Sequence, residues 1–138
     1  MQNVIPFLSY EDVGAAMDWL CGAFGFEERE RLTDEHGVIG HATLAIEDDL
    51  VYCASPTPDY QSPKHHAESC ETARKWLQVP WVIDGVLVQV DDLDTHFARA
   101  KEAGATMLTG IEDGGAGRLY RVADIEGHRW MFVERGPQ

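Results

Sequence analysis

The sequence is poor in basic residues, and it has neither a long apolar run nor an even set of cysteines. Its 138 residues contain 11 Lys and Arg against 24 Asp and Glu, which gives a net charge of −13. Nucleic acids and anionic membranes bind basic faces, so this balance argues against both as partners. No stretch reaches the roughly 18 apolar residues of a membrane-spanning helix. The charge is compatible with a cationic ligand, and it also serves solubility.

The cysteines are few and irregularly placed. Cys21, Cys53 and Cys70 lack the spacing of a zinc knuckle. Residues 1–12 become acidic too early for a secretory signal. We therefore expect reduced thiols and a cytoplasmic location. The length and an apolar fraction of 44% predict a single domain with a real hydrophobic core.

Two stretches, 80 residues apart, share one apolar pattern. Both place apolar or small residues at helical spacing, namely Val13, Met17, Leu20 and Phe24 in one stretch and Leu93, Phe97, Ala100 and Gly104 in the other. Asp12 and Asp92 precede these stripes as candidate N-caps, and Gly25 and Gly104 end them. Such self-similarity predicts two related modules.

Periodicity and turn signals predict the elements of each module. We expect helices at 12–24 and 92–103, with strands at 4–9, 26–32, 38–46, 50–55, 85–90, 106–110, 118–125 and 128–134. The first module then covers about 1–55 and the second about 84–135. The insertion at 56–83 carries a candidate helix at 64–77. We expect its Trp76 and Trp81 to anchor it to the body of the protein rather than to contact a ligand.

The repeat and the sequence Asp-Ile-Glu-Gly-His-Arg-Trp-Met-Phe at 124–132 resemble the glyoxalase/bleomycin-resistance/extradiol-dioxygenase superfamily, the vicinal oxygen chelate fold. The matching pieces are Ile5–Phe26, His41–Pro56, Gly85–Ala105 and Arg118–Phe132. The resemblance implies an α+β fold of two βαβββ modules, each curling a mixed sheet into a cup around a small-molecule site. It also implies a homodimer.

In the metal-dependent members of this superfamily, four His or Glu side chains from the first and last strands of each module hold a divalent ion. The resemblance carries those positions onto Ile5, Tyr52, Gly85 and Met131, none of which is a plausible ligand. A shift of one residue does not restore a ligand set. We therefore expect the fold without a metal ion or other cofactor, because fold alone does not confer function.

Strand alternation and the repeat register predict the remaining lining of the cup. Leu87 is expected to face inward, and the candidate ligand-binding residues are Phe7, His41, Tyr52, Gln89, Arg118, Tyr120, Arg129 and Met131. This lining is apolar and aromatic with a few polar points, as in many ligand pockets. We expect a neutral or mildly anionic aromatic or apolar ligand.

The polar candidates leave alternatives open. His41 is a weak candidate for a general base, or a buried histidine bonded to a hydroxyl such as that of Tyr120. Arg118 and Arg129 are candidates for binding a carboxylate or phosphate, or for surface ion pairs. The leading hypothesis is a metal-free protein that binds or sequesters a metabolite or antibiotic. The alternatives are a lyase, isomerase or dioxygenase using Zn, Ni or Fe, and a metal-free enzyme with His41 as base.

Overall fold

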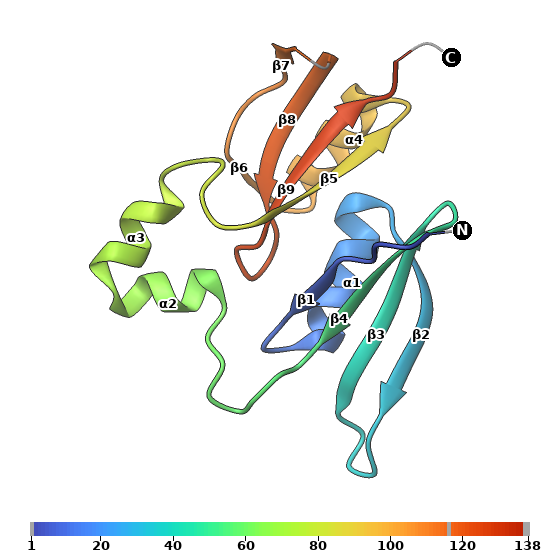
Figure 1. Cartoon of the computed structure of the whole chain (residues 1–138), viewed down its shortest axis with the longest axis vertical. Helices are drawn as coiled ribbons and strands as arrows, with labels where there is room; N and C mark the ends of the chain where they lie inside the picture. The colour runs from blue at the N-terminus through green and yellow to red at the C-terminus, as the bar shows by residue number, and fades with distance from the viewer. Residues whose placement is uncertain (1, 116, 137–138) are drawn as a thin grey trace. The chain divides into compact units, whose positions relative to one another are not determined.

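The computed structural model describes residues 2–115 and 117–136, and the chain forms two compact units, Met1–Ser62 and Pro63–Gln138 (Figure 1). Each unit contains one mixed sheet and one long helix. Among the described residues, no helix is long and apolar enough to cross a membrane.

The first unit is a βαβββ module. Its elements are β1 (Phe7–Ser9), α1 (Val13–Phe24), β2 (Glu27–Thr33), β3 (Ile39–Ile46) and β4 (Asp49–Ala54). The strand order is β1-β4-β3-β2, in which β1 pairs parallel with β4 and the other neighbours are antiparallel. Helix α1 packs on one face of this sheet (Figure 1).

The second unit repeats this plan and adds two short helices. Its elements are α2 (Pro63–Ser69), α3 (Glu71–Leu77), β5 (Gly85–Val90), α4 (Leu93–Glu102), β6 (Thr106–Met107), β7 (Glu112–Gly114), β8 (Gly117–Ala123) and β9 (Arg129–Glu134). The order β5-β9-β8-β6 matches that of the first unit, and β5 pairs parallel with β9. The predicted α+β fold of two βαβββ modules is confirmed.

The predicted helix signals act as expected. Asp12 accepts a hydrogen bond from the amide of Ala15 at 3.0 Å, and Asp92 accepts one from Thr95 at 3.1 Å. Each carboxylate satisfies an amide of the first turn that has no partner within the helix. Gly25 and Gly104 follow with φ of 80° and 89°, a conformation that costs glycine little.

The α1 stripe forms the centre of the first core, because Val13, Met17, Leu20 and Phe24 are all buried against the sheet. In α4, Leu93 and Ala100 are buried, whereas Gly104 lies beyond the helix and is exposed. The shared stripe is therefore confirmed in full for α1 and in part for α4.

Several element predictions were wrong in detail, and the strand expected at 106–110 contains only Thr106–Met107. The first strand is shorter than 4–9 and contains only Phe7–Ser9. The helix expected at 64–77 is two helices, because Cys70 adopts an extended backbone conformation between them. Residues 112–114, which were not predicted as a strand, form β7 and pair with β8, and residue 116 lies outside the described part of the chain.

Candidate functional site

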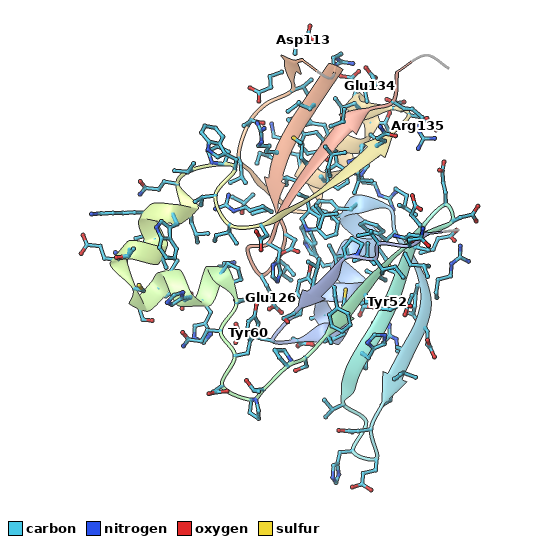
Figure 2. The ribbon with its side chains drawn as sticks, viewed as in Figure 1. Tyr52, Tyr60, Asp113, Glu126, Glu134 and Arg135 are labelled. Atoms are coloured by element: carbon cyan, nitrogen blue, oxygen red, sulfur yellow. The ribbon has the colours of Figure 1, made fainter. Side chains whose placement is uncertain are left out.

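Each sheet has one face toward its helix and one face away from it, which we call the cup face. In the first unit the cup face carries an aromatic cluster of Phe7, His41 and Tyr52. The ring of His41 lies 5.3 Å from that of Tyr52 and 6.1 Å from that of Phe7, between ring centroids. Figure 2 shows Tyr52 on β4, where it pairs with Phe7 of β1. The predicted orientation of these three residues is confirmed.

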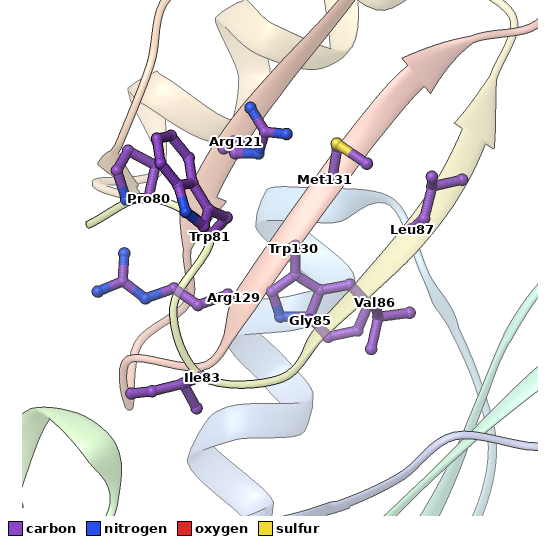
Figure 3. A pocket seen from close by; sticks show the side chains of 10 residues that line it. All are labelled: Pro80, Trp81, Ile83, Gly85, Val86, Leu87, Arg121, Arg129, Trp130 and Met131. Atoms are coloured by element: carbon purple, nitrogen blue, oxygen red, sulfur yellow. The ribbon is translucent and has the colours of Figure 1, made fainter. Parts of the chain in front are cut away.

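The cup face of the second unit contains a pocket of 180 Å³. Its lining residues come from the end of the insertion and from three strands, and they are Pro80, Trp81, Ile83, Gly85, Val86, Leu87, Arg121, Arg129, Trp130 and Met131 (Figure 3). Leu87 and Trp81 are exposed. An apolar hollow with a few polar groups is the usual form of a small-molecule site.

The two cup faces carry one matching pair of residues. Phe7 pairs with Tyr52 in the first unit, and Leu87 pairs with Met131 in the second. Each pair joins the first strand of its module to the last strand. Equivalent positions in the two modules therefore line the cup face of each sheet. Gln89 lies on the same side as Leu87, since Val88 and Val90 between and beyond them are buried. The predicted orientations of Gln89 and Met131 are thereby confirmed.

Arg129 lies in the pocket wall and is only 5% exposed. Its Nη2 donates to the carbonyl of Leu77 at 2.6 Å, which ties the end of α3 to β9. Burial lowers the pKa of Arg129 because desolvation disfavours the charged form. The predicted inward orientation of Arg129 is confirmed, and the alternative of a surface ion pair was wrong.

Arg121 and Trp81 are pocket residues that the sequence analysis did not assign to a ligand site. The guanidinium of Arg121 lies 5.7 Å from the centroid of the Trp81 ring, and its Nη1 is 3.2 Å from a carboxylate oxygen of Glu112. Trp81 is 70% exposed and lines the pocket, so it presents a broad apolar surface to the cup.

Arg118 does not face the cup, so its predicted orientation was wrong, and the alternative of a surface ion pair is confirmed for this residue. Its guanidinium binds Asp94 of α4 through two contacts of 2.8 and 3.1 Å and approaches Glu134 at 3.3 Å. These carboxylates raise the pKa of Arg118 above its ordinary value, with Asp94 the main cause. Arg118 therefore fixes the helix to the sheet on the opposite face.

Tyr120 also faces the helix rather than the cup. Its hydroxyl lies 2.6 Å from Nδ1 of His96, and its ring contacts that of Phe97 edge-on at 5.0 Å. Burial raises the pKa of Tyr120 because the phenolate would lose its solvation. The expected hydroxyl partner of His41 is thus bonded to a histidine of α4.

Both errors have the same cause, because the register predicted for β8 was displaced by one residue from the register in the structure. Strand register fixes which side chains face each side, and a single slip exchanges the two sets. The amide of Asp124 donates to the carbonyl of His128 at 2.9 Å and closes the turn, after which Arg121 pairs with Met131. Counting residues outward from this turn would have assigned Arg121 to the cup face, whereas the repeat register assigned Tyr120 to it.

The side chains do not fit a divalent ion at the positions used by metal-dependent superfamily members. Gly85 and Met131 both line the pocket, yet neither offers an oxygen or nitrogen side-chain ligand. Across residues 2–115 and 117–136, no three His, Cys, Asp or Glu side chains are grouped so that they could bind a metal.

Sequence comparison agrees with the fold. The sequence profile of the Glyoxalase/Bleomycin resistance protein/Dioxygenase superfamily matches residues 5–132, and the chain belongs to this superfamily. An uncharacterized protein of Mycobacterium bovis is 32% identical over 132 residues, which are 92% of this chain and 79% of that protein.

Two solved structures extend the comparison. TioX from Micromonospora sp. ML1 is 30% identical, with a TM-score of 0.70 over 99% of this chain and 98% of its own. The bleomycin-binding protein of Streptomyces verticillus, solved with copper(II)-bleomycin, is 19% identical, with a TM-score of 0.63 over 99% and 98% of the two chains. The second likeness is one of fold alone.

Proposed function

We propose that this protein binds and sequesters a small organic molecule, a metabolite or antibiotic, without a metal ion. The observation that carries the proposal is the pocket of the second unit, where Trp81, Leu87 and Met131 form an apolar wall beside two arginines. Binding proteins need such a wall and a few polar groups, but no reacting side chain. The bleomycin-binding protein of the same fold supports this class of function.

The aromatic cluster of the first unit supports the same function. Phe7 is 61% exposed although its ring contacts those of His41 and Tyr52. Stacked or edge-on contact with a ligand ring would bury this surface. We therefore assign Phe7, His41, Tyr52, Gln89, Arg129 and Met131 to ligand binding, with Trp81, Leu87 and Arg121 added from the structure.

The alternative of a metal-dependent enzyme has less support, because the four expected ligand positions carry no suitable donor. We also infer a homodimer in the cytoplasm. Exposed apolar side chains on both cup faces, including Phe7, Leu32 and Leu87, support association, and the free cysteines support a reducing compartment.

Titration calorimetry with 2-naphthamide, a neutral aromatic probe, tests the proposal. We expect wild-type protein to bind the probe, and Leu87→Glu to weaken binding by about tenfold or more, because a charge in an apolar wall must be desolvated. Val4→Glu is the matched control, since Val4 is 84% exposed and is not among the residues that line the pocket. Native mass spectrometry of freshly purified protein then identifies any retained molecule.

Two results would count against the proposal. One is the absence of heat on titration together with no retained molecule. The other is an equal loss of affinity in Leu87→Glu and Val4→Glu, which would place binding outside the pocket.

A further inference from the structure

The guanidinium of Arg129 is buried without a counter-charge. Of its donors, only Nη2 has a partner, the carbonyl of Leu77, whereas Nε and Nη1 have none within residues 2–115 and 117–136. Buried polar groups are almost always hydrogen-bonded, and a buried charge is normally paired. A buried guanidinium with free donors is suited to binding an anion.

The acid that lines a pocket together with Arg129 does not pair with it. Asp124 lines a second, 150 Å³ pocket together with Arg129. Its Oδ1 accepts from the amides of Glu126 and His128, both at 3.0 Å, and its Oδ2 accepts from the indole of Trp130 at 3.0 Å. The carboxylate of Asp124 is thus engaged in the β8–β9 turn.

The free donors of Arg129 suit a planar, two-oxygen acceptor. A guanidinium has two forks, one formed by Nε and Nη2 and the other by Nη1 and Nη2. Nη2 carries two hydrogens, so one hydrogen bond to Leu77 leaves one complete fork whichever hydrogen it uses. A carboxylate accepts from such a fork through two parallel bonds.

The segment that lines the pocket beside Arg129 is conformationally strained. Ile83 has a φ of 63°, a left-handed conformation that is costly for a β-branched residue. Figure 3 shows Ile83 and Trp81 on the segment that leads into β5, with Arg129 on the adjoining strand. Nε and Nη1 are out of contact with solvent, so a ligand reaches them only when neighbouring residues move.

We propose that Arg129 binds the carboxylate of the ligand, so that the pocket takes aromatic or apolar carboxylic acids, and that the 80–83 segment moves to admit the carboxylate. This inference rests on the proposed function of the same pocket. The apolar wall of Leu87 and Met131 accepts the body of the molecule, and the Arg129 fork fixes its charged end.

The test compares 2-naphthoate with 2-naphthamide by titration calorimetry, because the two differ only in the carboxylate. Wild type should bind 2-naphthoate about tenfold or more tightly than the amide. Arg129→Met should lose this preference and keep its affinity for the amide. Arg118→Met is the control, because Arg118 lies on the helix face, paired with Asp94, and should keep the preference.

A second measurement does not depend on the folding of a variant. In wild-type protein, 2-naphthoate should shift the Arg129 Nε–H resonance in a nitrogen-edited NMR spectrum, and 2-naphthamide should not. Equal affinities of wild type for the two probes, or a preference that survives in Arg129→Met, would overturn the inference and leave the proposed function intact. A preference lost only in Arg121→Met would also overturn it. If neither probe binds, this inference fails, and the proposed function fails with it when the purified protein also retains no molecule.

Discussion

At the scale of single residues, Tyr120 and His96 form a short contact between polar side chains in the second unit. The hydroxyl and Nδ1 are 2.6 Å apart, and the His96 ring also contacts Phe132, with centroids 4.1 Å apart. Tyr120 is fully buried. This pair stabilises the packing of α4 on the sheet and does not reach the pocket.

Tyr120→Phe should therefore lower the stability of the protein without changing its affinity for a ligand. Loss of the hydroxyl removes the partner of His96 Nδ1, and we expect a decrease of about 0.5–1.5 kcal/mol in the free energy of unfolding. Urea denaturation measures this change. Tyr52→Phe is the matched control and should change it by less than about 0.5 kcal/mol, because the Tyr52 hydroxyl has no hydrogen-bond partner among the described residues. An equal effect of both substitutions would contradict this assignment.

The raised pKa of Tyr120 also gives a pH dependence. An unfolded tyrosine ionises near pH 10, whereas burial keeps the folded Tyr120 protonated to higher pH. The contribution to stability is complete below about pH 10, and it is lost as the pH rises above that value. Between pH 9 and 11, the urea midpoint of Tyr120→Phe should therefore fall less steeply than that of wild type.

At the scale of elements, the β8–β9 turn sets the pairing register of the two strands that line the pocket. Asp124 bonds to two turn amides and to the Trp130 indole, so one carboxylate fixes both the turn and the first residues of β9. The turn also contacts α2, because the Lys64 amide donates to the carbonyl of Glu126 at 3.0 Å. Gly127 makes this contact possible.

Gly127→Ala should destabilise the second unit. Gly127 has a φ of 94°, and an added Cβ would lie 2.8 Å from the backbone nitrogen of Lys64. We expect a loss of about 1–3 kcal/mol in the free energy of unfolding, since both the conformation and the close backbone contact oppose a side chain. Urea denaturation and hydrogen exchange at the Lys64 amide measure the loss.

Gly22→Ala is the opposite substitution and the control for Gly127→Ala. Gly22 lies within α1, where an added Cβ would have no atom within 4 Å. It should raise stability by about 0.5–1 kcal/mol, because alanine loses less conformational entropy in a helix. Destabilisation by both substitutions to a similar degree would contradict the steric argument.

At the scale of the whole molecule, the two modules carry the same plan, and we propose that neither binds a metal ion. Elemental analysis of protein purified without added metal should find less than one tightly bound Zn, Ni or Fe per chain. About one ion per chain, lost in His41→Ala, would contradict this prediction and favour the metal-dependent enzyme. His41 is the informative substitution because it is the histidine of the first cup face.

We also expect a homodimer. Light scattering should give twice the mass of the 15.4 kDa chain. Because the exposed apolar surface of the cup faces favours association, Phe7→Glu and Leu87→Glu together should shift the mass toward that of one chain. Dimer mass retained in this double variant would show that the chains associate through another surface.

The net charge of −13 does not prevent an anionic ligand. Two exposed charges 10 Å apart interact by only about 0.4 kcal/mol in water, and salt reduces this further. A fork of two charge-assisted hydrogen bonds in a desolvated pocket is stronger, at about 1.5–3 kcal/mol. We therefore expect the contacts at Arg129, rather than the net charge of the protein, to determine which charge the ligand carries.

The sequence alone determined the elements that depend on local chemistry. Helical spacing in α1, the caps Asp12 and Asp92, and the glycines that follow were all readable, since each acts within a few residues. The repeat identified the two modules and placed Phe7, Tyr52 and Met131 on the cup faces. Alternation worked in β5, where buried Val88 and Val90 flank exposed Gln89.

Only the tertiary structure decided the rest of the site. In β8, Leu119, Tyr120, Val122 and Ala123 are all buried, so the strand has no polar alternation from which its orientation could be read. Hydrogen bonding to β9 fixes the orientation of β8 instead. It places Arg118 and Tyr120 on the helix face and Arg121 in the pocket. Trp81 lines the pocket because of the conformation of the insertion. A side chain's partner across a sheet depends on pairing between distant residues, which no local pattern specifies.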